Sequence, residues 1–445
     1  MITALEHHDM LLCQRLESLT EADKDYWSFK GNSRREYGHG LFQYPAMMVP
    51  QLARSVFEQA CSVHPDIERA GDPFSGSGTI MTESMMRGLA FSGTDINPMA
   101  ILLCRVKKGP FFVSALAQKA EELIAQINAD SRQLVEIHFT NRDKWFTSDV
   151  QVALSKIRRA ILHECALWAR RFFWVALAET VRATSNSRTS TYKLHIRTQD
   201  DINERRCDPV SIFKRILQRN ILHYDKQAKQ LSASGKLVRG HYRNDIAISL
   251  ADARYIGRNE ECDIIITSPP YGDNATTVPY GQYSYLPLQW IDINDIDTNM
   301  DNELLSSTHE IDTRSLGGSK CVTKSEADCI KDRSPAFVNY INSLCDQPRD
   351  RALRITAFFR DLDACLDPIL GTLRRGGLMI WTLGNRKVGG RRVPLDRILE
   401  ELFLTRNVRL ICQLTRRISS KRMAPKNSIA DTMSSETILV MRKAA

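Results

Sequence analysis

The stretch Asp263-Ile264-Ile265-Ile266-Thr267-Ser268-Pro269-Pro270-Tyr271 decides the fold of this 445-residue chain. Three consecutive β-branched isoleucines favour a strand that is covered on both faces, as in the middle of a parallel sheet. The two prolines then end strand pairing and hold the backbone extended. Because open α/β sheets bind ligands at the carboxyl ends of their strands, the sequence predicts a functional tip at residues 268–271.

This tip has the residue types that hold a flat heteroaromatic ring bearing an exocyclic amine. Tyr271 offers an aromatic face for stacking, while the Ser268 hydroxyl and the Pro269 carbonyl offer two acceptors to one NH2 group. Pro270 biases Pro269 towards an extended conformation, which directs that carbonyl outward. Two acceptors on one amine raise the electron density on its nitrogen and prepare it to attack an electrophile. A strand that merely ends in a Pro-Pro turn explains the same letters about equally well, so a second motif has to decide.

The second motif lies far upstream, at Asp72-Pro73-Phe74-Ser75-Gly76-Ser77-Gly78-Thr79, between a short segment over 67–71 and a helical pattern over 80–89. Glycines 76 and 78 allow a tight strand-to-helix turn and let a ligand approach the backbone. A second predicted strand ends at Asp95, where an acid can accept hydrogen bonds from the ribose hydroxyls of a nucleoside-containing cofactor. A lone Gly-x-Gly is weak evidence, but this turn, its downstream acid and the Pro-Pro-Tyr tip together indicate a cofactor-dependent enzyme.

Together the two motifs resemble those of the S-adenosylmethionine-dependent DNA amino-methyltransferases. The catalytic motif of that family is Asp/Asn/Ser-Pro-Pro-Tyr; the serine form, present here, is found mainly in N4-cytosine enzymes, whereas aspartate is commoner in N6-adenine enzymes. The glycine turn resembles the family's cofactor motif and, with Met81 in place of a third glycine, departs from the dinucleotide fingerprint. The resemblance covers residues 30–108 and 245–445. It implies an α/β fold with a Rossmann-like seven-stranded methyltransferase sheet that closes with an antiparallel pair.

The resemblance also implies a role for each matching residue. The expected catalytic residues are Ser268, Pro269, Pro270 and Tyr271. The expected S-adenosyl-L-methionine-binding residues are Tyr44, Pro45, Asp72, Phe74, Gly76, Gly78, Thr79, Asp95, Asn97 and Asp252. Tyr44 and Pro45 belong to a stretch that resembles the family's tenth motif, and Asp252 ends a third predicted strand over 246–252. The implied reaction is a direct in-line transfer to the amine of a base flipped out of the duplex, and no metal is required.

The chain divides into three regions. Residues 1–108 are expected to form the N-terminal part of the methyltransferase domain, with the cofactor motifs. Residues 109–244 read as a largely helical, basic insertion, with helical periods over 115–127, 150–163, 166–181 and 210–231. Residues 245–445 are expected to form the catalytic part, with a mobile insertion near 294–335. The helical insertion over 109–244 is the candidate target-recognition region. It precedes the third motif, whereas in the family arrangement that the chain most resembles the recognition region follows that motif.

Within the helical insertion, residues 184–193 are small, polar and basic and show no helical period. Such a loop suits phosphate oxygens and base edges, although a solvated linker has the same composition. The expected DNA-binding residues are Asn186, Arg188 and Lys193 here, with Asn274 and Thr276 in the loop after the catalytic tip. A net charge of +9 agrees with a polyanionic partner, which we expect to be double-stranded DNA.

Composition bounds the location and the rival functions. Eleven dispersed cysteines without a Cys-x-x-Cys pair, no signal peptide and no run of about 18 apolar residues predict a cytoplasmic protein, associated with the nucleoid through DNA and not with a membrane. The resemblance implies restriction-modification or defence, with a cognate restriction endonuclease as partner, and leaves the oligomeric state open. The rivals are an N6-adenine enzyme, an RNA or protein amine methyltransferase, and an inactive DNA-recognition subunit; no Pro-Cys dipeptide supports C5-cytosine chemistry.

Overall fold

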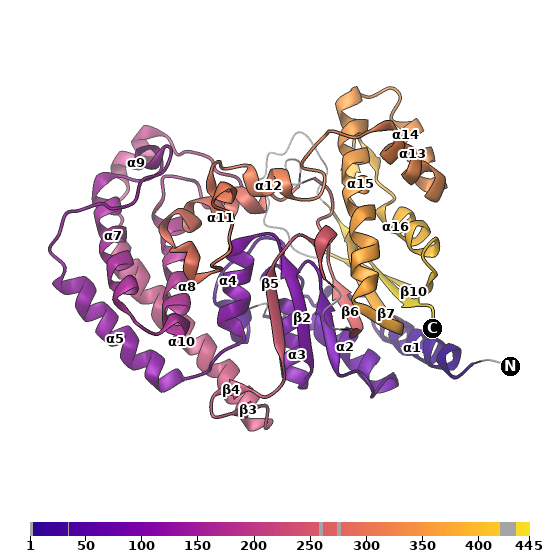
Figure 1. The fold of residues 1–445 in the computed structure, drawn as a ribbon, viewed down its shortest axis with the longest axis horizontal. Coiled ribbons are helices and arrows are strands. Elements are labelled where there is room, and N and C mark those ends of the chain that lie inside the picture. The colour runs from indigo at the N-terminus through magenta and orange to yellow at the C-terminus, as the bar shows by residue number, and fades with distance from the viewer. Residues whose placement is uncertain (1–2, 34, 258–260, 274–276, 419–432) are drawn as a thin grey trace.

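A computed structural model describes residues 3–33, 35–257, 261–273, 277–418 and 433–445. Within these ranges a seven-stranded sheet forms the middle of the molecule (Figure 1). In spatial order its strands are β10 (Val408–Arg417), β11 (Ser435–Lys443), β7 (Leu373–Gly384), β6 (Cys262–Thr267), β1 (Arg69–Asp72), β2 (Ala90–Asp95) and β5 (Ile246–Leu250). Strand β11 runs antiparallel to both of its neighbours, whereas the pairs from β7 to β5 are parallel. The expected α/β methyltransferase sheet with an antiparallel closing pair is therefore confirmed.

Strand β6 is central and is covered on both faces, as its sequence predicts. Ile264 and Ile266 belong to one hydrophobic core, and Ile265, which points to the opposite face, belongs to the other. All three are at most 1% exposed. The first core includes side chains of α1 (Ala4–Ala22), α2 (Pro50–Val63), α3 (Thr79–Arg87) and α4 (Pro98–Lys107). The second includes side chains of α14 (Pro335–Ser343), α15 (Arg349–Gly371) and α16 (Leu395–Leu404).

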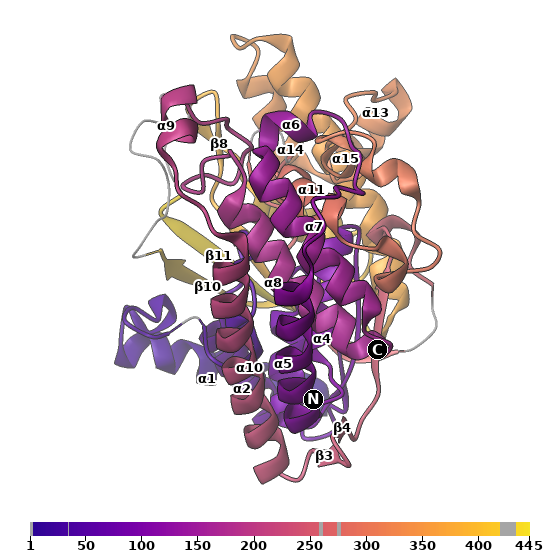
Figure 2. The same ribbon diagram turned by 90° about the vertical axis from the view of Figure 1, so that its left-hand side faces the viewer.

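The helical insertion lies beside the β5 edge of the sheet, opposite β10 (Figure 1). Its helices are α5 (Val113–Ala129), α6 (Arg142–Trp145), α7 (Ser148–His163), α8 (Leu167–Thr184), α9 (Gln199–Glu204) and α10 (Pro209–Ala233). Helices α5, α7, α8 and α10 run alongside one another and face the viewer in Figure 2. Phe172, Phe173 and Trp174 are buried, so these aromatic residues are core. A hairpin of β3 (Leu237–Val238) and β4 (His241–Tyr242) leads back to β5.

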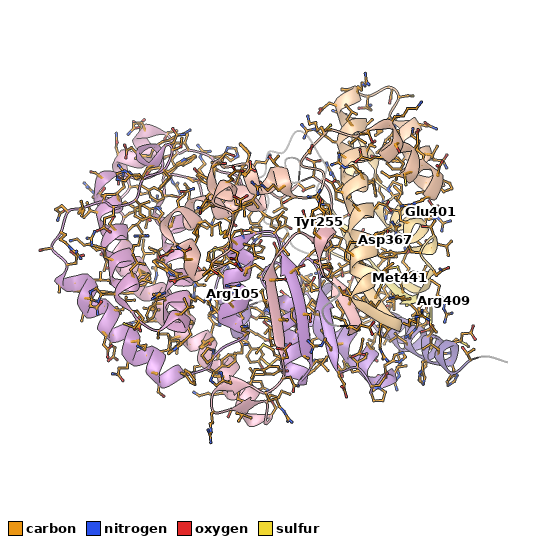
Figure 3. The ribbon with its side chains drawn as sticks, in the orientation of Figure 1. Arg105, Tyr255, Asp367, Glu401, Arg409 and Met441 are labelled. Atoms are coloured by element: carbon orange, nitrogen blue, oxygen red, sulfur yellow. The ribbon has the colours of Figure 1, made fainter. Side chains whose placement is uncertain are left out.

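Two further segments complete the carboxyl edge of the sheet. Helix α11 (Tyr280–Trp290) follows the catalytic tip and packs on α8 of the insertion. The segment over 294–335 contains α12 (Glu310–Arg314) and α13 (Lys324–Arg333), and it buries Ile311 and Ile330. Arg105 of α4, labelled in Figure 3, pairs with Asp297 of this segment at 2.8 Å. The mobility of the segment over 294–335 stays a prediction, although these contacts attach the segment to the domain.

The remaining described strands are short. Strands β8 (Lys387–Val388) and β9 (Arg391–Arg392) form a hairpin that follows β7. Among the residues with described placement, no helix is long and apolar enough to cross a membrane.

Candidate active site

The two sequence motifs lie at the ends of neighbouring parallel strands. Strand β1 ends at Asp72 and strand β6 ends at Thr267, and the two strands pair in parallel with Gly71 opposite Ile265. The Thr267 hydroxyl donates a hydrogen bond of 2.6 Å to Oδ1 of Asp72. The residue just before Ser268 is therefore bonded to the first residue of the glycine motif, although 195 positions separate them.

Both motifs line one open cavity, whose empty space is about 920 Å³ when the open solvent at its mouth is included. The expected site residues found in its lining are Tyr44, Pro45, Asp72, Phe74, Gly76, Thr79, Asp95, Asn97, Asp252, Ser268 and Pro270. Gly78, Pro269 and Tyr271 are not among the residues that line it. The shared cavity is the arrangement that a transfer between a bound donor and a bound acceptor requires.

The glycine turn has the backbone geometry that its sequence predicts. Gly76 and Gly78 have φ of +50° and +74°, a region that residues with a Cβ rarely adopt. Gly76 faces the cavity, so a side chain there would occupy ligand space. A Cβ at Gly78 would lie 2.8 Å from Sγ of Cys104 on α4. Gly78 therefore permits the turn and the close packing of α3 on α4, and Gly76 provides the open backbone surface.

Two buried carboxyl groups flank the turn. Oδ1 of Asp72 accepts from the Phe74 amide at 3.0 Å, and burial raises the pKa of Asp72 to about 7 against the lowering effect of its donors. The amides of Gly76 and Asn97 donate to the two oxygens of Asp95 at 2.7 and 2.8 Å. Burial raises the pKa of Asp95 to about 6, because desolvation outweighs these hydrogen bonds. A cationic or hydroxyl-bearing ligand would therefore stabilise the ionised form of both carboxyl groups.

Aromatic residues form another wall of the cavity. The rings of Tyr44 and Tyr280 are nearly parallel, with centroids 5.9 Å apart. Nδ2 of Asn97 donates to the Tyr44 hydroxyl at 3.0 Å and to Oγ of Ser284 at 2.9 Å, and Oδ1 of Asn97 accepts from the Met99 amide. Asn97 thus caps the start of α4 and holds the wall in place. Its side-chain amide is committed to protein partners, which favours a positioning role beside the ligand.

Asp252 follows β5 and lines the cavity, as its position after the third strand predicts. Its carboxylate accepts from the backbone amide of Arg254 at 2.9 Å and from Nε of the same residue at 3.0 Å. The Arg254 guanidinium also approaches Asp361 of α15 at 3.4 Å. Asp361 in turn accepts from the Gly317 amide at 2.8 Å. The orientation of Asp252 is therefore fixed by a network that reaches two other segments.

The catalytic tip divides between the cavity and the sheet end. Ser268 and Pro270 line the cavity, and Pro269 between them is buried. The Tyr271 ring lies against Gly384, and its hydroxyl donates to Oε1 of Glu436 at 3.1 Å. Burial and the nearby carboxylate raise the pKa of Tyr271, so the phenol stays neutral and donates. Ser268 and Pro270 therefore face the donor side, while the Tyr271 hydroxyl points away towards β11.

An ion-paired residue holds the chain just after the tip. Asp273 is 1% exposed, and its carboxylate lies 3.1 Å from a guanidinium nitrogen of Arg386 and 3.5 Å from one of Arg354. A Cβ at Gly272 would overlap the Arg386 guanidinium, so the glycine allows this approach. Asn274 and Thr276, two of the expected DNA contacts, lie outside the described residues.

Sequence reasoning missed part of the cavity wall. Ile311, Arg314, Ser315 and Leu316 line it, although they belong to the segment expected to be a surface insertion. Asp312 of the same segment accepts from the Gly281 and Gln282 amides at 2.7 and 3.1 Å, so it caps the start of α11. The signal available in the sequence was the pair of apolar residues, Ile311 and Leu316, in otherwise polar surroundings.

The other expected DNA contacts lie on a hairpin over residues 185–198, which is closed by a bridge between Ser187 and Ile196. Arg188 and Lys193 are exposed. Asn186 is 6% exposed, and its Nδ2 donates to the Lys144 carbonyl at 3.1 Å. Asn186 therefore secures the base of the hairpin in this structure, and DNA contact by any of the three stays a prediction.

The hairpin packs on α11, which also contributes to the cavity. The Tyr192 ring contacts the Tyr283 ring edge-to-face at 5.7 Å, and the Leu194 amide donates to Oε1 of Gln282 at 3.4 Å. One turn earlier, Tyr280 of the same helix lines the cavity. The hairpin with the exposed Arg188 and Lys193 thus packs on a helix that contributes to the cavity.

The chemistry of the cavity fits one class of cofactor. Apolar side chains such as Ile96, Leu316 and Ile311 suit a nucleobase, the Asp95 carboxyl suits ribose hydroxyls, and a bare backbone at Gly76 admits close approach. A sheet of this strand order, with such a cavity at the carboxyl ends of β1 and β6, is that of a Rossmann-like methyltransferase, and its methyl donor is S-adenosylmethionine.

Comparison with known proteins gives the family. No family model matches the chain. The chain is 30% identical over 458 residues to the type II methyltransferase M.MvaI of Kocuria varians, covering 98% of this chain and 98% of that protein. It is 26% identical over 132 residues to the type II methyltransferase M.MjaII of Methanocaldococcus jannaschii, covering 28% of this chain and 24% of that protein. The chain belongs to the type II methyltransferases.

Solved structures add little. The rRNA methyltransferase aviRa from Streptomyces viridochromogenes aligns over 90% of this chain and 86% of its own, with 11% sequence identity. The TM-score is 0.30, a value at which the likeness carries no argument. The fold assignment therefore stands on the strand order and directions of this chain.

Proposed function

We propose that this protein transfers the methyl group of S-adenosylmethionine to the exocyclic N4 amine of a cytosine in double-stranded DNA. The observation that carries the proposal is that Ser268 and Pro270 line the same cavity as Gly76 and Asp95. The serine at the head of the Pro-Pro-Tyr tip favours cytosine N4 over adenine N6, by resemblance to the amino-methyltransferases of DNA. The two type II methyltransferases among its relatives support DNA as the substrate.

In this proposal the tip residues hold the base and direct its amine. S-Adenosylmethionine supplies an electrophilic methyl group on a sulfonium. The Ser268 hydroxyl and the Pro269 carbonyl accept hydrogen bonds from the amine, and Tyr271 stacks on the ring. The amine is paired inside a duplex, so the base has to leave the stack first. Orientation of the two reactants then contributes up to several kcal/mol of the rate enhancement, and the two acceptors stabilise charge that develops on the amine.

DNA would lie along the side of the site that carries the hairpin over 185–198. Its exposed Arg188 and Lys193 suit phosphate contacts, and the net charge of +9 favours association with a polyanion. The helical insertion would then serve as the target-recognition region. A role in restriction-modification, with a cognate restriction endonuclease as partner, follows from the type II relatives and is part of the proposal.

The test is a methyl-transfer assay on unmethylated duplex DNA, with mass spectrometry of the nucleosides released afterwards. N4-methylcytosine is the expected product. N6-methyladenine would identify the same scaffold acting on adenine, transfer to RNA alone would identify an RNA enzyme, and donor binding without transfer would identify an inactive recognition subunit. Each of these three results would overturn the proposal.

Two variants tie the activity to the tip. Ser268→Ala should lower the transfer rate by about 100-fold or more, in the range seen when one preorganised polar group is removed from an active site. Tyr271→Ala removes a stacking contact of about 1–3 kcal/mol and should lower the rate by about 5- to 150-fold. Donor binding measured by calorimetry should survive in both variants. Leu404→Ala on α16, whose parent residue is 66% exposed and does not line the cavity, serves as the unaffected control. Full activity in either tip variant would show that the site lies elsewhere.

A biological readout follows for the restriction-modification role. Long-read sequencing of DNA from cells that express the protein should show N4-methylcytosine at one short recurring sequence. That DNA should resist an endonuclease that cleaves the same sequence. Modified cytosines scattered without a shared context would contradict a site-specific role.

A further inference from the structure

The Tyr271 side chain is anchored at both ends. Its ring lies so close to Gly384, the last residue of β7, that a Cβ there would be 2.2 Å from Cδ2 of the tyrosine. Its hydroxyl donates to Oε1 of Glu436 at 3.1 Å. The ring therefore crosses from the loop after β6 over the end of β7 and reaches the start of β11.

The partners of Tyr271 form a row across three strands. Glu436 of β11 is directly paired with Gly384 of β7 on one side and with Arg416 of β10 on the other. Side chains at directly paired positions project to the same face of a sheet, so the tyrosine ring, the carboxylate and the guanidinium follow one another across the sheet end. The glycine in this row leaves the space that the tyrosine ring fills.

The carboxylate at the middle of the row is itself held. The Glu436 and Arg416 side chains are 14% and 4% exposed and form an ion pair. Nε of Arg416 also donates to the Trp27 carbonyl at 2.7 Å, outside the sheet. Since Arg416 is fixed at two points, Glu436 has little freedom to follow a moving tyrosine. The acceptor is thus preorganised for the phenol.

From this row we propose that Glu436 is a positioning residue that sets the ring plane of Tyr271 for stacking on the target base. The proposal rests on the stacking role proposed for Tyr271 above. It adds that the phenol hydroxyl is hydrogen-bonded within the protein, so the base contacts only the face of the ring. The ring can therefore stack on a base of any shape. Discrimination between bases then falls to the acceptors at residues 268 and 269.

The test is a double-mutant cycle on the full chain, made of Glu436→Ala, Tyr271→Phe and the double variant. Groups in direct contact typically couple by 0.5–3 kcal/mol, or about 2- to 150-fold in rate. Glu436→Ala should therefore slow methyl transfer to DNA by about 3- to 30-fold in the wild-type background and by less than about twofold in the Tyr271→Phe background. The dissociation constant for S-adenosylmethionine, measured by calorimetry, should not change in either background.

A structural role for Glu436 alone would give a different result. Loss of the carboxylate leaves Arg416 unpaired and destabilises the sheet end, but that effect would be the same whether or not residue 271 has a hydroxyl. Equal slowing in both backgrounds would therefore overturn the proposal, and so would full activity of Glu436→Ala. Glu436→Gln provides the conservative rescue, because its amide can keep one hydrogen bond to the phenol, and it should restore most of the rate.

Two further measurements keep the outcomes separate. Should Glu436→Ala fail to fold, as judged by thermal unfolding, Tyr271→Phe alone removes the same hydrogen bond and leaves the ion pair intact. It should slow transfer by about 3- to 30-fold with donor affinity unchanged, and an undiminished rate would overturn the proposal. Tyr271→Ala is measured first: if that variant keeps full activity, the stacking role in the proposed function fails, independently of Glu436.

Discussion

The glycine turn over residues 72–79 and the hairpin over 185–198 are both polar stretches near one cavity, yet they are built in opposite ways. The turn is largely buried, and backbone amides donate to the carboxyl groups beside the cavity: Phe74 to Asp72, and Gly76 and Asn97 to Asp95. About half of the hairpin's residues are exposed, and its contacts with α11 include the Tyr192–Tyr283 ring contact and a hydrogen bond from the Leu194 amide. The comparison suggests that the donor site is preorganised, whereas the hairpin can adapt to its partner.

The largest expected effect is a loss of donor affinity at the preorganised glycine turn. Gly76→Val should lower the affinity for S-adenosylmethionine by at least about 100-fold, because a branched side chain at φ of +50° is strained and occupies the cavity. Calorimetric titration of the donor measures this loss.

Gly235→Val is the matched control for that substitution. Gly235 has φ of +66°, and nothing lies within 4 Å of a Cβ built there. The control should carry a similar backbone strain while its donor affinity stays close to wild type. Donor binding that survives in Gly76→Val would contradict the donor-binding role proposed for the glycine turn.

A smaller effect at the same site is the dependence of donor affinity on pH. Burial raises the pKa of Asp72 to about 7, so lowering the pH from 8 to 6 protonates the carboxyl and removes its attraction for a cationic donor. Affinity for S-adenosylmethionine should therefore fall on acidification, by at most about tenfold across that range if the bound state keeps Asp72 ionised. Calorimetry at several pH values gives the slope.

The control for the pH effect is Asp72→Asn, which retains any titration of the donor and of Asp95. Because the pKa of Asp95 is raised to about 6, the variant should show a weaker dependence centred nearer to that pH. An unchanged slope in Asp72→Asn would assign the dependence to another group.

The smallest effect concerns the hairpin. Arg188→Ala should weaken DNA binding several-fold and reduce the slope of log affinity against log salt concentration by about 1, as expected for one lost phosphate contact. Binding isotherms at a series of salt concentrations measure both quantities, and donor affinity should stay constant.

Asn186 offers the contrast within the same hairpin. Its amide donates to the Lys144 carbonyl, so Asn186→Ala should lower the free energy of unfolding by about 1 kcal/mol, the typical net value of one hydrogen bond. If Arg188→Ala leaves the salt slope unchanged, the hairpin does not contact the DNA backbone through that residue.

Local sequence was sufficient where chemistry and conformation are local. Three isoleucines followed by two prolines predict a doubly covered strand with a rigid end, and β6 has that form. Glycines at 76 and 78 predict a tight strand-to-helix turn, and in that turn both adopt positive φ. The helical periods of the insertion also correspond to helices α5, α7, α8 and α10, because side-chain spacing on a helix is set by backbone geometry.

Long-range pairing was not accessible in the same way. The stretch over 311–316 belongs to a segment expected to be a mobile surface insertion, yet Ile311 and Leu316 line the same cavity as Tyr280. Asn186 looked like a free polar residue in a basic loop, and it is buried. In both cases the outcome depends on which distant surface the segment packs against, and residue type alone does not specify that surface.

The sequence by itself determined the strand β6, its Pro-Pro end and the glycine turn with its acids, and from these it predicts the chemistry of an amine-holding tip. Only the tertiary structure decided that Tyr271 lies over Gly384 and reaches Glu436, because that contact depends on the register of β7 against β11. Register across a sheet is fixed by the packing of whole faces, and a shift of one residue would turn Glu436 to the other side.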